Sequence, residues 1–548
     1  MYIDDNDIKI LRLKKKVEYC KIEILDSDYK TEKMLEGYIL SGNYSINSDA
    51  VIRRTCNITM VYNKKTSFDE SIYYNNFLKV YLGFNNLKGD ITYYSIGVYA
   101  FDKESFKYDT TTNEISFNLS DLCSLLDSDH YGTEYGAESS SIYAINPKTG
   151  ERLPDDEIIL RNIVRKLLLD FSNNNQSLYR PKLNFNNSLI CPIGRANGRG
   201  DNYKELGYEY RWDVLPYNLD FSADEGTLDK ITRIRDLYGI YEFFFDEDGT
   251  FIFQEIPHTD YDMVMLDNDI VSDLVLSEST DRNIYDVKNV IEIWGKTVDI
   301  NKDYRVADGF YNIDDTNSAG VYSVTISNYV ETGYSDSMKL ALKVDKENSK
   351  ALNTYININN LGNKIIIDKS SGRSITQNQF KAGITYIFEY SSSYGLGGVF
   401  YYVSSFQTHA VAIMTNGEAL LNNKKSYYIN KYNTNNIMFV VDKNNKYCVE
   451  YIGEIRKRYS GDKYANLESD TLAADYAKTK LEQLCRRTSS LSLEMIIVPW
   501  LDVNQKIQYK AKQTDEIKTY ITKSINGDLL SGKMTVNLME FYATLDVD

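Results

Sequence analysis

The sequence predicts a mainly β fold with α+β portions, and three observations support this. Tyr is abundant, with 47 residues, while Pro is rare, with 7, and ring side chains suit half-buried strand surfaces. Short runs of alternating apolar and polar residues recur through the first 150 positions, as expected of strands. Three stretches show helical spacing instead. At 548 residues the chain is too long for one hydrophobic core, so three or four domains are expected.

Residues 1–150 form the first expected domain. Half a dozen short strands separated by turn residues predict an antiparallel sandwich or barrel. The expected strands are Val17–Leu25, Tyr38–Ile46, Cys56–Tyr62, Phe77–Leu82, Tyr93–Phe101 and Ile115–Leu119.

Residues 151–284 are expected to form an α+β region that contains a helix and a hairpin. A first helix begins near Pro154, because proline and acidic residues open it and apolar residues follow at helical spacing. Ser222 and Glu225 predict a capping box for a second helix that ends at Gly239. The apolar stripe of this second helix is Leu228, Ile231, Ile234 and Leu237.

The segment "FFFDEDGTFIFQE" that follows is spaced like a calcium loop. Counting from Phe244 places Asp246, Asp248, Gly249 and Glu255 at ligand positions 3, 5, 6 and 12 of an EF-hand. An EF-hand needs flanking helices, however, and here alternating aromatic runs flank the loop. A β-hairpin with an Asp-Gly turn explains the segment better than a calcium site.

Residues 303–440 are rich in Ser, Asn, Gly and Tyr and show short strands without a convincing helix, which predicts an inserted all-β module. Residues 441–548 follow with an amphipathic helix at Glu468–Arg487 and then strands. Asn526-Gly527 predicts a tight turn between the last two strands. Met534, Val536 and Leu538 line one face of the final strand.

The charge and cysteine content exclude several classes of protein. A net charge of -16 argues against a protein that grips nucleic acid by its phosphates. The N-terminal residues are acidic and lack the apolar core of a secretory signal, and no apolar run approaches the ~20 residues that span a bilayer. Six cysteines without a CxxC pair are expected to be buried and reduced, which favours folding in a cytoplasm.

No catalytic, metal-binding or cofactor-binding residue is predicted. His130, His258 and His409 lack the HExxH or HxH context of a metal site, and no GxSxG elbow is present. The glycine-rich stretch "CPIGRANGRGDNY" at residues 191–203 lacks the Lys-Ser/Thr of a phosphate-binding loop. It is expected to be a surface loop, and enzymatic activity is not expected.

Several segments in order along the chain resemble the tail hub, or baseplate hub, proteins of bacteriophages. They are "VIRRTCNITM", "FLKVYLGF", "FFFDEDGTFIFQEI", "IYDVKNVIEIWGK", "THAVAIMTN", "YIGEIRKRYSGDKYANLESDTLAADYA" and "VPWLDVNQKIQY". The module also resembles a small β-module that recurs in phage tail fibres and tail-tip proteins.

The resemblance implies two tail-tube-like antiparallel β-barrels per subunit, so that a homotrimer presents a ring of six. The first barrel would be residues 1–150. The second would combine a strand within residues 285–302 with the strands of 441–548, and the module at 303–440 would interrupt it.

A hub of this kind is a structural virion protein that joins the sixfold tail tube to the threefold tip and surrounds the DNA exit channel. The implied partners are the tail tube or distal tail protein, the tape measure protein and tip spike or fibre proteins. The genome would pass without specific binding, and the chain would be made in the host cytoplasm. The alternative is a receptor-binding protein whose inserted module recognises a host surface glycan. A tail-associated hydrolase is the third possibility.

Overall fold

The structure is a computed structural model of the chain. It describes residues 5–13, 18–35, 39–62, 76–85, 88–127, 139–147, 152–173, 183–185, 213–257, 262–282, 287–297, 304–314, 319–326, 333–336, 338–349, 353–369, 372–393, 397–405, 409–416, 437–440, 446–461, 464, 467, 470–485 and 489–542. The chain divides into unit 1, Met1–Asp286 with Arg487–Asp548, and unit 2, Val287–Arg486.

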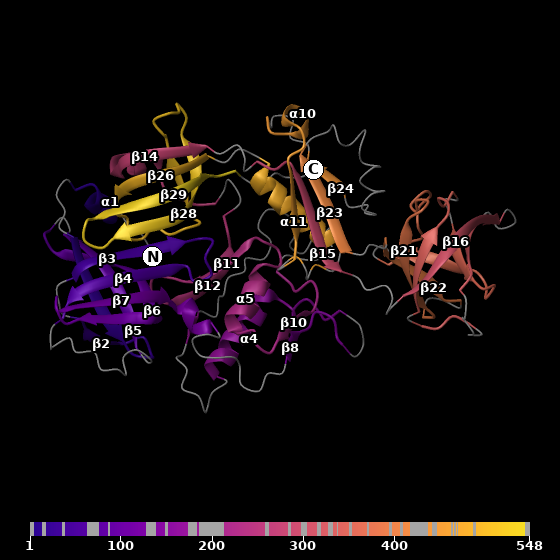
Figure 1. The fold of residues 1–548 in the computed structure, drawn as a ribbon, viewed down its shortest axis with the longest axis horizontal. Coiled ribbons are helices and arrows are strands. Elements are labelled where there is room, and N and C mark those ends of the chain that lie inside the picture. Colours follow the sequence, from indigo (N-terminus) through magenta and orange to yellow (C-terminus); the bar gives the residue numbers. More distant parts are fainter. Residues whose placement is uncertain are drawn as a thin grey trace. The chain divides into compact units, whose positions relative to one another are not determined.

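Unit 1 is built on a mixed sheet of 13 strands to which both ends of the chain contribute (Figure 1). Its N-terminal group lies in the order β3-β4-β7-β6-β5-β1-β2. The six strands predicted from the alternating pattern are all present, and β2 is an additional short edge strand. The group comprises β1 (Glu18–Leu25), β2 (Thr31–Met34), β3 (Ile39–Asn47), β4 (Arg54–Val61), β5 (Phe77–Asn85), β6 (Ile91–Asp109) and β7 (Glu114–Asp121).

The C-terminal group continues the same sheet in the order β14-β26-β29-β28. The turn predicted at Asn526-Gly527 is absent, because both residues lie inside β28 and pair with β29 and β3. The chain reverses after β28 instead. The strands are β14 (Val275–Arg282), β26 (Ser489–Ile496), β28 (Lys518–Asp528) and β29 (Lys533–Glu540), with β13 (Val264–Leu266) pairing with β27 (Lys506–Tyr509) beside β28.

Strand β28 joins the two groups. Along one side it pairs with β29. Along the other side its first residues pair with β27 and its last residues, Ser524–Asp528, pair with β3. Two separate barrels are expected from the sequence, whereas in the described part of the chain these strands form one continuous sheet, because β28 is long enough to bond to both groups.

One hydrophobic core serves both strand groups. Cys56, Ile58 and Met60 of β4 alternate inward, and Val536 and Leu538 of β29 lie in the same cluster. The helices α1 (Asp5–Leu11) and α6 (Asn268–Leu274) also pack into this core. Neither helix is predicted from the sequence, because each is only two turns long and owes its stability to packing.

The helical region of unit 1 contains α4 (Leu160–Asn173) and α5 (Thr227–Arg235), which contact each other, and the hairpin of β11 (Tyr241–Phe245) and β12 (Thr250–Glu255). Ser222 and Glu225 do bond to each other, but they lie before the helix. The N-cap is Gly226, whose N–H donates to Asp229 at 2.9 Å. The remaining short elements are η2 (Leu122–Leu126), β8 (Ser139–Ile142), β9 (Asn184–Phe185) and β10 (Leu219–Ser222).

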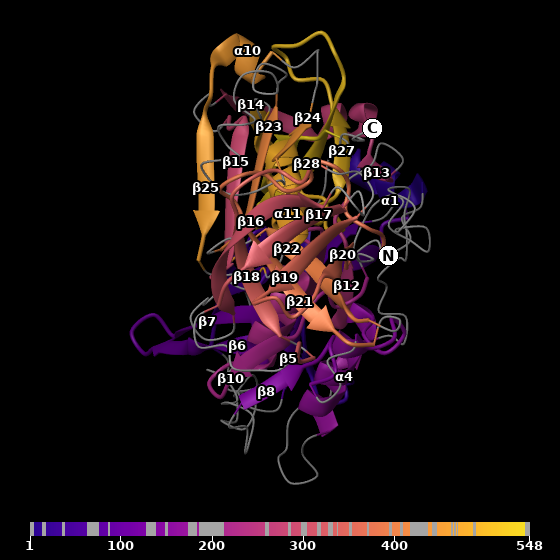
Figure 2. The ribbon, with the colours of Figure 1, turned by 90° about the vertical axis from the view of Figure 1, so that its right-hand side faces the viewer.

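Unit 2 contains a four-stranded sheet in the order β24-β23-β15-β25 (Figure 2). Helix α11 (Asp470–Leu484) packs against this sheet (Figure 1). The expectation that residues 285–302 join a second barrel with the C-terminal strands is wrong, because β15 pairs with β23 and β25 instead. The strands are β15 (Val290–Thr297), β23 (His409–Asn416), β24 (Ile437–Val440) and β25 (Arg456–Ser460), with the one-turn helix α10 (Val449–Ile452) before β25.

The inserted module is a closed seven-stranded barrel, and no other closed barrel occurs among the described residues. It is shorter than the expected 303–440, because β23 and β24 belong to the four-stranded sheet. The barrel interrupts that sheet between the paired residues Thr297 and His409. Its strands are β16 (Arg305–Asp314), β17 (Ala319–Val324), β18 (Lys339–Val344), β19 (Thr354–Ile358), β20 (Lys364–Asp368), β21 (Thr385–Ser391) and β22 (Val399–Ser405).

The barrel has a hydrophobic core of its own. Tyr322, Phe380 and Phe388 are fully buried inside it, and the ring of Phe380 makes edge-on contacts with the rings of Tyr322 and Phe388. Such aromatic pairs add stability beyond the area they bury. Among the described residues of the whole chain, no helix is long and apolar enough to cross a membrane.

Candidate functional site

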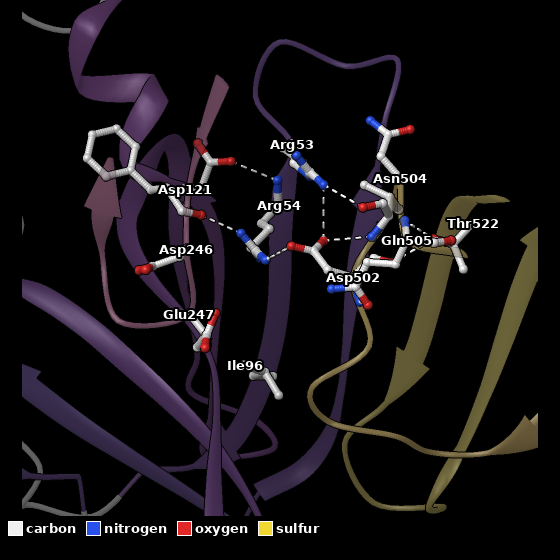
Figure 3. A network of polar contacts seen from close by, with 12 residues as sticks. Arg53, Arg54, Ile96, Asp121, Asp246, Glu247, Asp502, Asn504, Gln505 and Thr522 are labelled. Carbon is white, nitrogen blue, oxygen red and sulfur yellow. Dashed lines mark hydrogen bonds and ion pairs between the residues drawn. The ribbon is translucent and has the colours of Figure 1, made fainter. Parts of the chain in front are cut away.

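The most elaborate polar site in the described part of unit 1 is a buried ionic network, which we call the arginine junction. It consists of Arg53, Arg54, Asp121, Glu242, Asp502, Asn504 and Thr522 (Figure 3). Arg53 lies directly before β4, and the others come from β4, β7, β11, the loop before β27, and β28. The junction therefore connects the N-terminal strands, the hairpin and the C-terminal strands.

Arg53 bridges the hairpin and the C-terminal loop. One guanidinium nitrogen donates to Glu242 Oε2 at 2.8 Å, and another donates to the backbone oxygen of Val503 at 2.8 Å and lies 3.4 Å from Asp502. The guanidinium also lies 3.9 Å from the ring centre of Phe244, a favourable cation–π position. At 4% exposure Arg53 is a buried cation, so these partners replace the water that it loses.

Arg54 makes the complementary connections. Its side chain donates to the backbone oxygen of Phe245 in the hairpin and to Asp502 Oδ2, the latter at 2.5 Å. Its backbone N–H donates to Asp121 at 2.8 Å. Asp121 also accepts from the N–H of Cys123 and so caps the 3₁₀ helix η2.

The loop that supplies Asp502 has a fixed shape. Asn504 adopts a left-handed conformation with φ 56°, which asparagine tolerates better than most residues. Its side-chain amide donates to Glu242 at 2.7 Å. Thr522 is fully buried, and its hydroxyl lies 2.7 Å from the backbone oxygen of Asp502. The backbone N–H of Thr522 donates to the backbone oxygen of Gln505. β28 thereby holds Asp502 opposite the two arginines.

The charges of the junction determine the protonation of its carboxylates. Burial by itself would raise the pKa of Asp502, but the positive charges of Arg53 and Arg54 outweigh it and lower the pKa. Burial raises the pKa of Asp121 despite the backbone N–H groups that it accepts from. Asp502 is therefore the carboxylate whose negative charge the arginines stabilise.

The hairpin turn beside the junction is a structural turn. Asp246 accepts from the backbone N–H groups of Asp248 and Thr250, at 2.9 and 2.8 Å, as Asp does in tight turns. Asp248 pairs with Lys79 of β5 at 2.8 Å. Gly249 has φ 76°, and a side chain there would also meet Val98. These contacts attach the turn to the N-terminal strands.

A cavity of about 80 Å³ adjoins the junction. Its polar lining comes from Arg54, Glu247, Trp500, Asp502 and Gln505. The described lining of the cavity contains no serine, threonine, cysteine or histidine. No group of three metal-ligating side chains occurs anywhere in the described part of the chain. The chemistry of the site is that of an ionic lock between chain segments.

Most of the residues weighed in the sequence lie elsewhere. His130, His258 and the glycine-rich stretch 191–203, with Cys191, lie outside the described residues, and His409 is in β23. Cys56, Cys123, Cys448 and Cys485 are buried free thiols and Cys20 is partly buried. The junction was not predicted, although two adjacent arginines before a strand in an acidic chain were a usable signal.

One family model matches part of the chain. It is a domain of unknown function, DUF5048, and it matches residues 444–545, less than half of the chain. No curated protein matches the sequence.

Solved structures that match this chain include three phage tail proteins. A 43 kDa tail protein of prophage MuSo2 from Shewanella oneidensis is 9% identical, with a TM-score of 0.39 and coverage of 95% of this chain and 98% of its own. A tail protein from Neisseria meningitidis is 6% identical, with a TM-score of 0.40 and coverage of 96% and 98%. A prophage tail protein from Listeria monocytogenes is 9% identical, with a TM-score of 0.37 and coverage of 96% and 95%. Phage tail and baseplate proteins are among the structural neighbours of this chain.

Proposed function

We propose that the chain is a structural subunit of a phage tail, a hub that joins the sixfold tail tube to the threefold tip. The observation that carries this proposal is the construction of unit 1. Two groups of strands, one from each end of the chain, share a sheet through β28 and are tied together by the arginine junction. Because each chain contains two such groups, a ring of three copies contains six groups in all.

The proposal assigns each strand group the role that a tail-tube-like barrel has in the resembled hub proteins. The group β1–β7 and the group β26–β29 would each stand beneath one subunit of a sixfold tube. Such an adaptor needs the two groups in a fixed relation, because a hinge between them would break the match to the tube. Buried ion pairs between the segments, as between Arg54 and Asp502, supply that rigidity.

The net charge fits a channel for DNA. Three copies of a chain with net charge -16 carry about -48, and a lumen that shares the sign of the phosphates would keep DNA from adhering to its wall. In this role the genome slides past without specific binding. The proposed partners are further copies of the chain, the tail tube or distal tail protein, the tape measure protein and a tip spike or fibre. The proposed location is the virion.

The oligomeric state tests the proposal directly. We expect the purified chain to form a trimer in native mass spectrometry, and cryo-electron microscopy of assembled tails to show three copies around the axis at the tip. A stable monomer with no place in assembled tails, or six copies around the axis, would contradict the hub. A channel wall lined by lysine and arginine would contradict only the electrostatic part.

A second role, recognition of a host surface glycan, is favoured by the inserted barrel. The barrel has its own core. The chain enters it after Thr297 and leaves it before His409, and these two residues pair with each other in the four-stranded sheet. Residues 305–405 contain nine Lys and Arg and nine Asp and Glu residues, so the module is neutral in an otherwise acidic chain. The module can therefore serve a function that the rest of the chain does not need for assembly.

Deleting the module separates the two roles. Replacing residues 298–408 with Asn-Gly leaves a two-residue hairpin loop between β15 and β23, which pair with each other. We expect this variant to trimerise and to enter tails, and the tails to lose adsorption to host cells. Tails that adsorb normally would exclude the receptor role, whereas failure of the folded variant to enter tails would make the module part of the assembly.

A further inference from the structure

Three neighbouring strands of the inserted barrel share an outer face of unusual composition. Strand β17 pairs with β16 on one side and with β19 on the other. The pairing register aligns two rows of residues across these strands. One row is Phe310, Ser323 and Asn357, and the next is Asn312, Val321 and Tyr355.

These six side chains point away from the barrel core. Their sequence neighbours Tyr311, Tyr322, Val324, Ile356 and Ile358 belong to the core, and successive side chains on a strand point to opposite faces. Phe310 is 58% exposed. Tyr355 is half-buried, and Val321 forms an apolar floor with only 8% exposure.

The spacing of the two rings follows from the sheet. Phe310 and Tyr355 stand on strands separated by β17, and neighbouring strands lie about 4.8 Å apart. Their backbone positions are thus about 10 Å apart across the strands and one row apart along them. Between them lie the hydroxyl of Ser323 and the amide of Asn312, which are 3.3 Å apart.

The charge of this face limits its ligand. Strands β17 and β19 contain no charged residue, and on β16 the charge nearest to Phe310, Asp308, pairs in register with Lys343 of β18. An uncharged ligand with many hydroxyl groups matches a face that offers rings, amides and a hydroxyl but no net charge. An acidic or basic partner would have no counter-charge there.

We propose that this face binds a neutral oligosaccharide that lies across β16, β17 and β19. Phe310 and Tyr355 each stack on the apolar face of a sugar ring, and Asn312 and Ser323 bond to the hydroxyl groups of the ring between them. The inference rests on the second role proposed above, recognition of a host glycan, and assigns it to residues. A single open face binds weakly, and three copies on one tail tip add avidity.

Saturation-transfer NMR on the full chain tests the site with defined probes. The probes are neutral tetrasaccharides of glucose, galactose, mannose and N-acetylglucosamine. We expect at least one to bind, and Phe310→Ala and Tyr355→Ala each to weaken it about fivefold, as expected for the loss of one stacked ring. Tyr451→Ala is the matched control, because Tyr451 is a 70% exposed tyrosine outside the barrel and its loss is expected to leave binding unchanged.

The outcomes separate this inference from the hub. No binding of any probe by the wild-type chain, or binding that both variants retain, would overturn the saccharide site even if the chain forms a trimer. Capture of a purified tail protein by wild type but not by Phe310→Ala, without saccharide binding, would replace the saccharide with a protein partner. If each variant has the same thermal unfolding midpoint as wild type, the loss of saccharide binding is local and does not come from misfolding.

Discussion

Replacing Asp502 with Asn is the sharpest test of the arginine junction. The substitution keeps the shape of the side chain and removes the negative charge that faces Arg53 and Arg54. Asp502 is 14% exposed, and its oxygens lie 2.5 Å from Arg54 and 3.4 Å from Arg53. Arg53 then keeps its ion pair with Glu242, and the carboxylates that still act on Arg54 are Asp121 and Glu247.

The magnitude follows from these distances. With an effective dielectric constant of about 20, the attraction at these separations is about 5 to 7 kcal/mol per pair. Desolvation of the charges offsets part of it, and removing one partner of a buried ion pair typically costs about 3 to 5 kcal/mol. We expect Asp502→Asn to lower the free energy of unfolding of unit 1 by this amount.

Urea unfolding followed by tryptophan fluorescence measures the effect, since Trp500 lines the cavity beside the junction. The matched control is Asp273→Asn, which removes the same charge from an exposed pair with Arg12 at 2.8 Å. Exposed pairs contribute about 0 to 1 kcal/mol. If the two variants lose equal stability, or Asp502→Asn loses less than about 1 kcal/mol, the junction is not a lock.

Three further predictions follow from other parts of the chain. The pKa of Asp502 is lowered in the fold, so its contribution is present above its ordinary value of 3.8 and is lost as the pH falls through the folded value. The urea midpoints of wild type and Asp502→Asn should therefore draw together as the pH is lowered below 3.8. Gly320→Ala should destabilise the barrel by about 1 to 3 kcal/mol, because a Cβ there would lie 2.1 Å from the hydroxyl of Tyr311, and calorimetry should show no such loss for Gly333→Ala, which meets nothing within 4 Å. Burial raises the pKa of the Cys56 and Cys123 thiols, so both should react with a thiol reagent only after unfolding, as mass spectrometry of labelled peptides can check.

The strands of the N-terminal half were predictable because one face of each is buried. In β4 the alternation of Cys56, Ile58 and Met60 with polar residues identifies both the strand and its inward face. The sequence also predicts the hairpin, since Asp246 and Gly249 supply its turn. In these cases the local pattern and the tertiary contacts agree.

The long-range pairing was not predictable. Nothing local in β15 shows that its partners are β23 and β25, because the residue pattern of a buried strand does not depend on which strands it pairs with. The Asn526-Gly527 pair is a strong turn signal, yet it lies inside β28, where Gly527 is packed against the ring of Tyr44. At that position the need for close packing outweighs the preference for a turn.

The junction was missed for a related reason. Arg53 and Asp502 are separated by nearly the whole chain, and only the pairing of β28 with β3 brings their segments together. A sequence shows charges but not their partners.

The facing pair of Thr297 and His409 has an evolutionary consequence. The Cα atoms of opposed residues in an antiparallel pair are about 5 Å apart. Any domain whose two ends lie equally close, as the termini of domains often do, can therefore be inserted between these two residues. A lineage can exchange the barrel for another fold in one recombination event while the pairing of β15 with β23 stays intact. The barrel and the sheet that carries it can thus change independently within one gene.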